Sequence, residues 1–531
     1  MRRYIAWLFL LVATPFCAFL ALTLAPGWWI GFAAATALAG LGLHDVLQRR
    51  HTLLRNYPVL AHFRWLFEAI RPEIRQYVLE SDTEAAPFSR MQRSLVYQRA
   101  KGVSDKVPFG TELDVYGDAY EWLNPSAAAL TPPEDTDLRV RVGNAQCTQP
   151  YDASVLNISA MSFGALSAAA IRALNRGAAE GGFAHDTGEG GISRYHLDAG
   201  GDLIWEIGSG YFGCRDAHGG FSAELFAEGA QRPQVRMVEL KLSQGAKPGH
   251  GGVLPGTKVT PEIAEARSVP VGRDCISPAA HSAFSTPVEM MEFLQRLREL
   301  SGGKPVGFKL CIGHRWEFLA LCKAMRETGI VPDFVVIDGA EGGTGAAPLE
   351  LSNHVGTPLR EGLVFAHQAL VGCDLRERVR LAAAGKITSG FRMAGNMALG
   401  ADWCNAARGF MFALGCVQSR NCHTDRCPTG VATQNPWRQR GLVVEDKAAR
   451  VRRFHDHTVA ALAEVVATAG LTHPLELQPH HIARRTGTTE IRTLDRVYPG
   501  LARGELLAGT GHDGFRDAWR QASADSFRPV T

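Results

Sequence analysis

Three cysteines in the C-terminal third of the chain have the spacing of metal ligands. Cys416, Cys422 and Cys427 lie in the run GCVQSRNCHTDRCPTGVATQ, with the pattern C-x5-C-x4-C and Pro428 directly after the last thiol. Iron–sulfur clusters are held by cysteine thiolates, and a proline often follows a ligand cysteine. Three ligands suit a three-iron cluster, or a four-iron cluster with one open iron. The spacing therefore favours an iron–sulfur site and one-electron chemistry.

Two other interpretations of these cysteines stay open. A structural zinc ion needs a fourth ligand, for which His423 is the only close candidate in the sequence. Unliganded buried thiols are the other alternative. A disulfide framework is disfavoured, because the 11 cysteines of the chain are scattered at irregular spacings.

Glycine-rich segments follow several of the predicted strands. The loop after Asp338 reads GAEGGTGA, Gly385 and Gly390 bracket the run KITS, and Gly409 follows a further strand. Glycine lets backbone N–H groups approach a phosphate closely, and the late loops of a barrel commonly bind one. The alternative is that these glycines only form turns. A phosphate-bearing redox cofactor in a barrel indicates FMN, which exchanges a hydride or single electrons.

Basic residues are concentrated in the centre of the chain. Lys241 and Lys247 belong to the run KLSQGAKPGHGG after a predicted strand, where they suit an anionic substrate or the pyrimidine edge of a flavin. Arg267 follows, and a guanidinium can hold a carboxylate with two parallel hydrogen bonds. Lys309 stands alone in the apolar run 306–312. Because a buried lysine is costly without a partner, we place it at the barrel mouth; a solvated lysine at a strand end is the alternative.

The elements that must position these residues alternate regularly from residue 155 onward. Apolar runs at 155–160, 235–242, 306–312, 333–338, 379–384 and 401–406 are interpreted as strands, and 167–181, 287–300 and 316–328 as helices. This alternation predicts a parallel sheet with crossover helices. The fold class is therefore α/β, a (β/α)8 TIM barrel with insertions. An open doubly wound sheet is disfavoured, because no strand leads into a G-x-G-x-x-G turn.

The first fifty residues predict a transmembrane helical hairpin. Residues 4–24 and 28–43 are apolar and are separated by a turn at 25–27; a span needs about 20 apolar residues. Basic residues flank both ends of the hairpin, which predicts that both ends face the cytoplasm. A cleaved signal peptide would explain one apolar run but not two. We expect a protein of the cell membrane with two helices and a cytoplasmic catalytic domain.

We divide the chain into four segments. Residues 1–50 form the hairpin, 51–150 an N-terminal helical region and linker, 151–440 the FMN-binding barrel with the iron–sulfur loop 416–427, and 441–531 a C-terminal helical extension. Lys and Arg number 56 against 53 Asp and Glu, a net charge of +3. That balance gives no reason to expect nucleic acid as a partner.

Together these motifs resemble the FMN-binding domain of glutamate synthase. The similarity covers about residues 157–470 and includes AMSFGALS at 160–167, TGEGG at 187–191, KLSQGAKPGHGG, ISP at 276–278, GGTGA and CHTDRCPTGVATQ, in the order of the family. The two-helix N-terminus resembles the stand-alone, membrane-associated branch of that family.

The resemblance implies a barrel that holds FMN and a 3Fe–4S cluster and reduces 2-iminoglutarate, made from 2-oxoglutarate and ammonia, to L-glutamate. It implies Cys416, Cys422 and Cys427 as cluster ligands, Lys247 and Arg267 on the 2-oxoglutarate carboxylates, and Glu189 near the substrate. The cofactor-binding residues expected are Met161, Ser162, Lys241, Gln244, Lys309, Gly343, Thr344, Gly345, Gly385 and Gly390.

The chain also departs from the family pattern. Val253 stands where the family commonly has a glutamine, and Glu289 is the nearest residue to an expected acidic side chain. No amidotransferase or dinucleotide-binding segment is recognised, so we expect ammonia and electrons from elsewhere, the latter from a ferredoxin or a reductase subunit. Two other functions stay open: a subunit of an N-methylglutamate synthase, and a membrane-bound flavin/iron–sulfur electron-transfer module without a small-molecule substrate.

Overall fold

A computed structural model describes residues 2–84 and 86–530. The chain divides into two compact units, residues 1–86 and 87–531, which are described separately.

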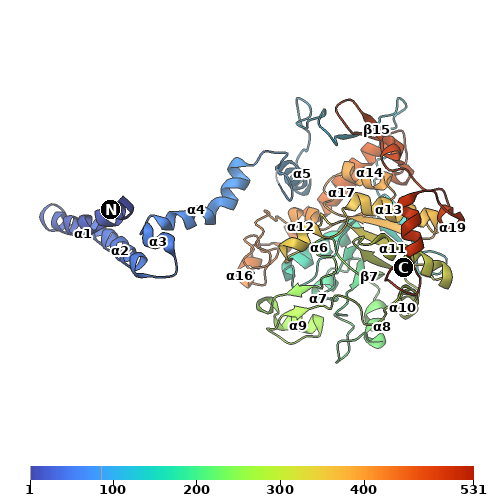
Figure 1. The fold of residues 1–531 in the computed structure, drawn as a ribbon, viewed down its shortest axis with the longest axis horizontal. Coiled ribbons are helices and arrows are strands. Elements are labelled where there is room, and N and C mark those ends of the chain that lie inside the picture. The colour runs from blue at the N-terminus through green and yellow to red at the C-terminus, as the bar shows by residue number, and fades with distance from the viewer. Residues whose placement is uncertain (1, 85, 531) are drawn as a thin grey trace. The chain divides into compact units, whose positions relative to one another are not determined.

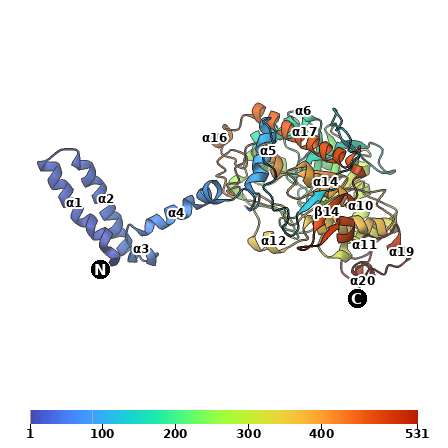
Figure 2. The ribbon, with the colours of Figure 1, turned by 90° about the horizontal axis from the view of Figure 1, so that it is seen from above.

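The N-terminal unit is built on two apolar helices, α1 (Ile5–Thr23) and α2 (Trp28–Leu47), which pack against each other as a hairpin (Figures 1 and 2). Both are long and apolar enough to cross a membrane. Trp7 Nε1 donates a hydrogen bond to the backbone oxygen of Ala39 at 2.9 Å, and the ring lies against Gly42. After α2 come α3 (Thr52–Asn56), α4 (Ala61–Ile74) and the π-helical turn η2 (Arg75–Leu79).

Eight parallel strands close into a barrel in the second unit (Figure 1). In chain order, which is also their order around the barrel, they are β4 (Leu156–Ile158), β5 (His185–Asp186), β6 (Leu203–Ile207), β7 (Val235–Lys241), β10 (Val306–Leu310), β11 (Phe334–Asp338), β12 (Arg380–Ala384) and β13 (Trp403–Ala406). The predicted (β/α)8 barrel is confirmed.

Helices follow each strand: α6 (Ala168–Gly181), α7 (Arg194–Leu197), α8 (Ala223–Ala230), α10 (Pro287–Leu300), α11 (Arg315–Thr328), α12 (Leu349–His354), α13 (Leu359–Gly372), α14 (Gly390–Ala398) and α15 (Arg408–Ala413). Their starts follow local chemistry, because hydroxyl side chains of Ser167, Ser222, Thr286 and Ser389 each accept a hydrogen bond from a backbone N–H of the first turn. The helices begin where the barrel strands have ended, so the connecting loops gather at one end.

Two barrel strands were not among the predicted ones. β5 has two residues, His185 and Asp186, both polar, and so offers no apolar run. β6 carries Glu206 within an otherwise apolar stretch that is buried throughout. The other six observed strands each lie inside a predicted range. They could be predicted because an all-parallel barrel buries both faces of a strand, which makes the strand apolar along its length.

Additional elements surround the barrel. The antiparallel pair β2 (Arg139–Val142) and β3 (Tyr151–Ser154) lies at its amino end, where the N–H of Asn144 donates to Asp333 Oδ1 at 2.8 Å. An insert between β7 and α10 contains β8 (Val253–Leu254), η3 (Gly256–Lys258), α9 (Pro261–Arg267) and β9 (Cys275–Ile276). α5 (Arg90–Lys101) and the long α17 (Val444–Thr468) pack together, and α17 also covers α6 and α14.

The remaining elements are short. They are β1 (Glu121–Leu123), β14 (Ile482–Arg485) and β15 (Ile491–Thr493), which form a three-stranded sheet, with α16 (Pro436–Gln439), α18 (Leu494–Val497), α19 (Glu505–Ala508), α20 (Asp513–Gln521), η1 (Arg2–Tyr4), η4 (Pro474–Glu476) and η5 (Pro479–His481).

Replacing Gly390 at the start of α14 is expected to destabilise the barrel. A Cβ there would lie 2.5 Å from the backbone nitrogen of Leu462 in α17, a contact that backbone movement alone relieves. We expect Gly390→Ala to cost about 1–3 kcal/mol and to lower the melting temperature in thermal unfolding. Gly395→Ala in the same helix is the control: its nearest neighbour is a flexible Arg360 nitrogen at 3.8 Å, so it should stabilise by up to about 1 kcal/mol. Equal melting temperatures for the two variants would contradict this packing.

Candidate active site

A deep cleft opens at the carboxyl ends of the barrel strands. Its walls come from the loops after β4, β5, β7, β11, β12 and β13 and from the insert after β7. The described lining residues include seven cationic side chains, namely Lys241, Lys247, Lys258, Arg267, Lys309, Lys386 and Arg408, and three acidic ones, Glu189, Glu206 and Asp338. An excess of positive charge of this size in a cleft selects anionic ligands.

Most of the predicted site residues meet in this cleft. Those that line it are Met161, Ser162, Glu189, Lys241, Gln244, Lys247, Arg267, Lys309, Gly343, Thr344, Gly345, Gly385 and Cys422. Cys416 and Cys427 lie behind the wall, in the same loop as Cys422. Gly390 is not among the lining residues, because it opens α14 and faces α17.

One end of the cleft has the features of a phosphate site. The Gly343–Gly345 loop follows β11, Gly385 follows β12, and Arg408 follows β13. A Cβ added at Gly345 would meet no atom within 4 Å, so this loop borders open space. Arg408 donates to the backbone oxygen of Thr344 at 2.8 Å and has no carboxylate partner in the described chain. Backbone N–H groups and a free guanidinium suit a phosphate group.

Arg408 was not predicted from the sequence. It stands directly after the last barrel strand, and that position is the signal that would have identified it. Lys386 was missed as well; it lines the cleft next to Gly385 with a positive φ of 49°, a conformation that non-glycine residues rarely adopt.

Lys247 and Arg267 are buried cations without an acidic partner. Arg267 is 5% exposed, and it donates to Ser162 Oγ at 3.2 Å and to the backbone oxygen of Phe163 at 3.1 Å. Its Nε has no hydrogen-bond partner in the described chain. Lys247 is 2% exposed, and burial lowers the pKa of its ammonium. Because unpaired buried charge is costly, the two side chains fit an anion that enters the cleft.

Glu189 is held close to these cations. Lys241 Nζ lies 3.0 Å from Glu189 Oε1, and Ser277 Oγ donates to Glu189 Oε2 at 3.3 Å. Burial raises the pKa of Glu189, but Lys241, Arg267 and Lys247 outweigh it and hold the pKa below its usual value. Glu189 is therefore an ionised carboxylate at neutral pH.

Lys309 lines the cleft from inside the barrel. It is 3% exposed and forms ion pairs with Glu206 and Glu239. Burial opposes its charge, but Glu206, Glu239, Asp186 and Asp338 together raise the pKa of Lys309 well above its usual value. The ammonium group is therefore fixed by its ion pairs and charged at neutral pH.

The cysteine loop is strained and rich in donors. Gln418, Arg420 and Asp425 all have positive φ, between 55° and 61°, although none is glycine. Such residues persist only where the surrounding structure holds them, and they cluster at ligand sites. The loop therefore adopts a conformation that its own backbone preferences do not explain.

The thiols of this loop differ in their surroundings. Burial raises the pKa of Cys416 to about 11. Burial also raises the pKa of Cys427, but the Thr429 hydroxyl and the backbone N–H groups at 429, 431 and 432 outweigh it and lower the pKa below its usual value. Within the described residues, the three sulfurs do not form a group with all distances under 4.8 Å.

Lys258 joins the cleft to the cysteine loop and was not predicted. It is 2% exposed, and its Nζ donates to the backbone oxygens of Cys422 at 3.2 Å and of Ala165 and Ala432, both at 3.5 Å. Its partners are carbonyls from two loops that are distant from it in the sequence, so no local sequence pattern marks it.

Two positions where the chain departs from the family pattern have separate explanations. Val253, on β8, lines the cleft. Glu289 does not: it belongs to the capping box of α10 and accepts hydrogen bonds from the backbone N–H groups of Ser285 and Thr286. Glu289 therefore caps a helix and does not supply the acidic side chain of the cleft.

Comparison with known proteins decides the family. Residues 133–472 match the model described as the conserved region in glutamate synthase. The chain belongs to the glutamate synthase family. It is 36% identical over 502 residues to the glutamate synthase large subunit-like protein YerD of Bacillus subtilis, covering 86% of this chain and 94% of that one.

Other members match over part of their length. The archaeal-type glutamate synthase [NADPH] of Thermotoga neapolitana is 33% identical, over 59% of each chain. This protein thus spans about three-fifths of that relative. Among solved structures, the L230A mutant of flavocytochrome b2 with benzoylformate aligns with a TM-score of 0.43 at 11% identity, covering 89% of this chain and 95% of that one.

Removing the Lys258 ammonium is expected to loosen the cysteine loop. Lys258→Met leaves three carbonyls without their donor, and each unsatisfied buried carbonyl lowers the free energy of unfolding by about 1–3 kcal/mol. We expect faster tryptic cleavage after the exposed Arg420 and Arg426, measured by mass spectrometry of limited digests. Lys247→Met removes another buried lysine of the cleft that holds no carbonyl of this loop, and it should leave the digestion pattern unchanged. Identical patterns for both variants would contradict the role of Lys258.

Proposed function

We propose that this protein is an oxidoreductase of the glutamate synthase type, which reduces 2-iminoglutarate, formed from 2-oxoglutarate and ammonia, to L-glutamate with FMN and a 3Fe–4S cluster. The observation that carries the proposal is the pair of buried cations Lys247 and Arg267, which form no ion pair within the described chain and line the same cleft as the glycine loops. Membership in the glutamate synthase family supports it.

The cleft residues fit FMN. The Gly343–Gly345 loop, Gly385 and Arg408 would hold the phosphate, while Met161, Ser162, Lys241, Gln244 and Lys309 would surround the ring system. When bound, FMN supplies a hydride to substrate and accepts electrons singly from a cluster. Lys309, kept charged by Glu206 and Glu239, places positive charge at the inner wall of the cleft, where it stabilises negative charge on a bound ring.

The cysteine loop fits an iron–sulfur cluster. Its three thiols come from one strained loop, and the donors around the Cys427 sulfur stabilise the thiolate form that a metal requires. Cys422 both lines the cleft and belongs to this loop, so a cluster there would lie next to a ligand in the cleft.

The chain's own side chains account for substrate binding and orientation. Lys247 and Arg267 bind the carboxylates of the 2-oxo acid, and ionised Glu189 attracts the N–H of the neutral imine. Orientation of this kind lowers a barrier by roughly 7–11 kcal/mol. The insert after β7 supplies Lys247, Val253 and Arg267 and so completes the substrate side of the cleft.

Ammonia and electrons would come from other proteins, the electrons from a ferredoxin or a reductase subunit. The two apolar helices would anchor the protein in the cell membrane with the barrel on the cytoplasmic side.

A second candidate function is supported by Val253. An apolar side chain at this position of the cleft wall leaves room for a methyl group on the nitrogen, which suits a subunit of an N-methylglutamate synthase.

Loss of one cluster ligand should separate the two cofactors. We expect the purified protein to show flavin absorbance and an iron–sulfur signal in electron paramagnetic resonance. Cys422→Ala should abolish the iron–sulfur signal and keep the flavin, because it removes one of three thiolates. Cys214→Ala, at a buried thiol outside the loop, is the control and should keep both. Iron-free protein from cells supplied with iron would contradict the cluster.

Turnover with a chemical reductant tests the substrate. With reduced methyl viologen, 2-oxoglutarate and ammonium we expect glutamate, detected by mass spectrometry. Arg267→Gln should lower kcat/KM for the 2-oxo acid roughly 30-fold or more, mainly through KM, because it removes a buried charge from the carboxylate. Arg273→Gln, an exposed position of the same insert, should leave kcat/KM unchanged.

The outcomes separate the candidates. Preference for methylamine over ammonium would favour the N-methylglutamate alternative. If no 2-oxo acid oxidises the reduced protein, an electron-transfer module without a substrate is favoured and the proposal is wrong.

A further inference from the structure

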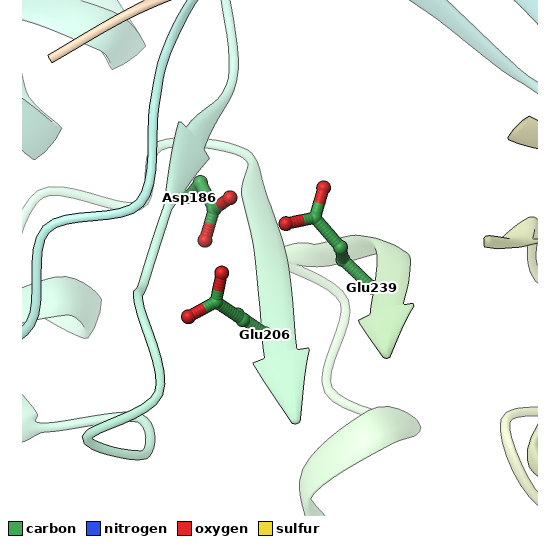
Figure 3. Close-up of side chains that lie close together, drawn as sticks. All are labelled: Asp186, Glu206 and Glu239. Carbon is green, nitrogen blue, oxygen red and sulfur yellow. The ribbon is translucent and has the colours of Figure 1, made fainter. Parts of the chain in front are cut away.

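Three carboxyl groups meet inside the barrel, beneath the cleft. Asp186, Glu206 and Glu239 come from the neighbouring strands β5, β6 and β7, and Figure 3 shows their carboxyl groups turned toward one another. Each offers an oxygen within 4.8 Å of the others. All three side chains are at most 1% exposed. We call this set the carboxyl cluster.

The register of the strands places charge in two layers. Glu206 and Glu239 are direct partners on β6 and β7, and Lys241 and Lys309 are direct partners on β7 and β10. Like charges directly opposite each other destabilise a sheet, so each layer needs the other. Lys309 Nζ lies 2.9 Å from Glu239 Oε1 and also pairs with Glu206.

The cluster holds more potential negative charge than its cations can balance. Within the described chain, Lys309 is the ammonium in closest contact with the cluster. Lys241 lies 4.0 Å from Glu206 and pairs more closely with Glu189, at 3.0 Å. Asp338, on β11, faces Lys309 as a further acid and accepts a hydrogen bond from the N–H of Gly245. The contacts of the Glu239 carboxyl group are with the Lys309 ammonium and with the carboxyl group of Glu206.

Three buried carboxylates around one ammonium would leave two uncompensated charges, which a dry interior does not tolerate. Burial and the neighbouring carboxylates raise the pKa of Asp186 well above its usual value, and the pKa of Glu239 rises to about 7 because burial outweighs Lys309. Carboxyl groups this close share protons, as paired catalytic carboxyls do.

Only one member of the cluster reaches the cleft. Glu206 lines its wall, whereas Asp186 and Glu239 lie behind it. Glu206 also connects, through Lys241, to Glu189 at the substrate side. An acidic proton held on Asp186 or Glu239 therefore has a short route to the cleft through Glu206.

We propose that the carboxyl cluster of Asp186, Glu206 and Glu239 stores a proton at neutral pH and delivers it through Glu206 to the substrate nitrogen in the cleft. The inference rests on the proposed imine reduction. The hydride forms the new C–H bond, the C=N π pair moves to nitrogen, and the cluster's O–H bond breaks to form the N–H bond. The cluster is left one charge more negative and regains its proton from solvent.

The stored proton is tested on the full-length protein without cofactors. Infrared difference spectra of wild type against Glu239→Gln should show loss of the carbonyl band of a protonated carboxyl, which shifts in D2O. Glu464→Gln, the same change at an exposed helix position, is the control and should not remove that band. If Glu239→Gln does not fold, Asp186→Asn replaces it. If neither cluster variant loses a protonated-carboxyl band that the wild-type protein shows, the proposal is overturned.

Delivery is tested on the loaded protein in single turnover. With pre-reduced protein and 2-oxoglutarate plus ammonium, proton release and uptake are followed with an indicator dye, and the solvent isotope effect is followed on the chemical step. We expect Glu239→Gln to slow that step at least tenfold and to leave the KM for the 2-oxo acid unchanged. In the wild-type protein the rate of the step should fall as pH rises through about 7, and in the variant this fall should be weaker. An unchanged rate and pH profile overturn delivery by the cluster. A protein that binds no flavin but keeps the infrared band refutes the proposed function and leaves the stored proton standing.

Discussion

Positive charge that is buried without a carboxylate partner is the constraint on which the cleft depends. Buried Lys247 and Arg267 and the partly exposed Arg408 are held in place by backbone oxygens and hydroxyls or by packing alone, and their charges stay available to a ligand. A folded chain bears that cost only where other interactions fix the geometry. Here the closed barrel and the insert after β7 fix that geometry, since all three side chains stand on loops and helices that follow barrel strands.

The barrel interior solves the opposite problem. Lys309 is surrounded by more carboxyl groups than it can neutralise, and burial with the neighbouring carboxylates raises the pKa of Asp186 and Glu239, which favours their protonated forms. The same ammonium therefore faces two environments: below it an acidic layer that holds protons, and above it the cleft. Residues two apart on a strand point to the same side of the sheet. Glu239 and Lys241 are two apart on β7, so both side chains face the barrel interior, with the acidic layer one step below the basic layer.

The sequence was sufficient for the fold and for most of the cleft, but only where the information is local. β7, β10 and β11 read as strands because they are buried on both faces, whereas β5 consists of His185 and Asp186 and has no apolar signature. The motifs with distinctive spacing located the glycine loops and the cysteines. Arg408 and Lys258 were missed because their roles follow from long-range contacts. Arg408 contacts Thr344, and Lys258 contacts carbonyls of two separate loops.

Gly390 and Glu289 show the limit of reasoning from motifs. Both belong to segments whose neighbours reach the cleft, yet one faces α17 and the other caps α10. Lys258 is the converse case, a residue outside every motif whose side chain ties the cleft wall at Ala165 to the cysteine loop at Cys422. Because that single ammonium contacts both walls, a displacement of the cysteine loop changes the cleft as well. The two candidate cofactor sites are thus joined by a buried lysine and the carbonyls that accept its hydrogen bonds.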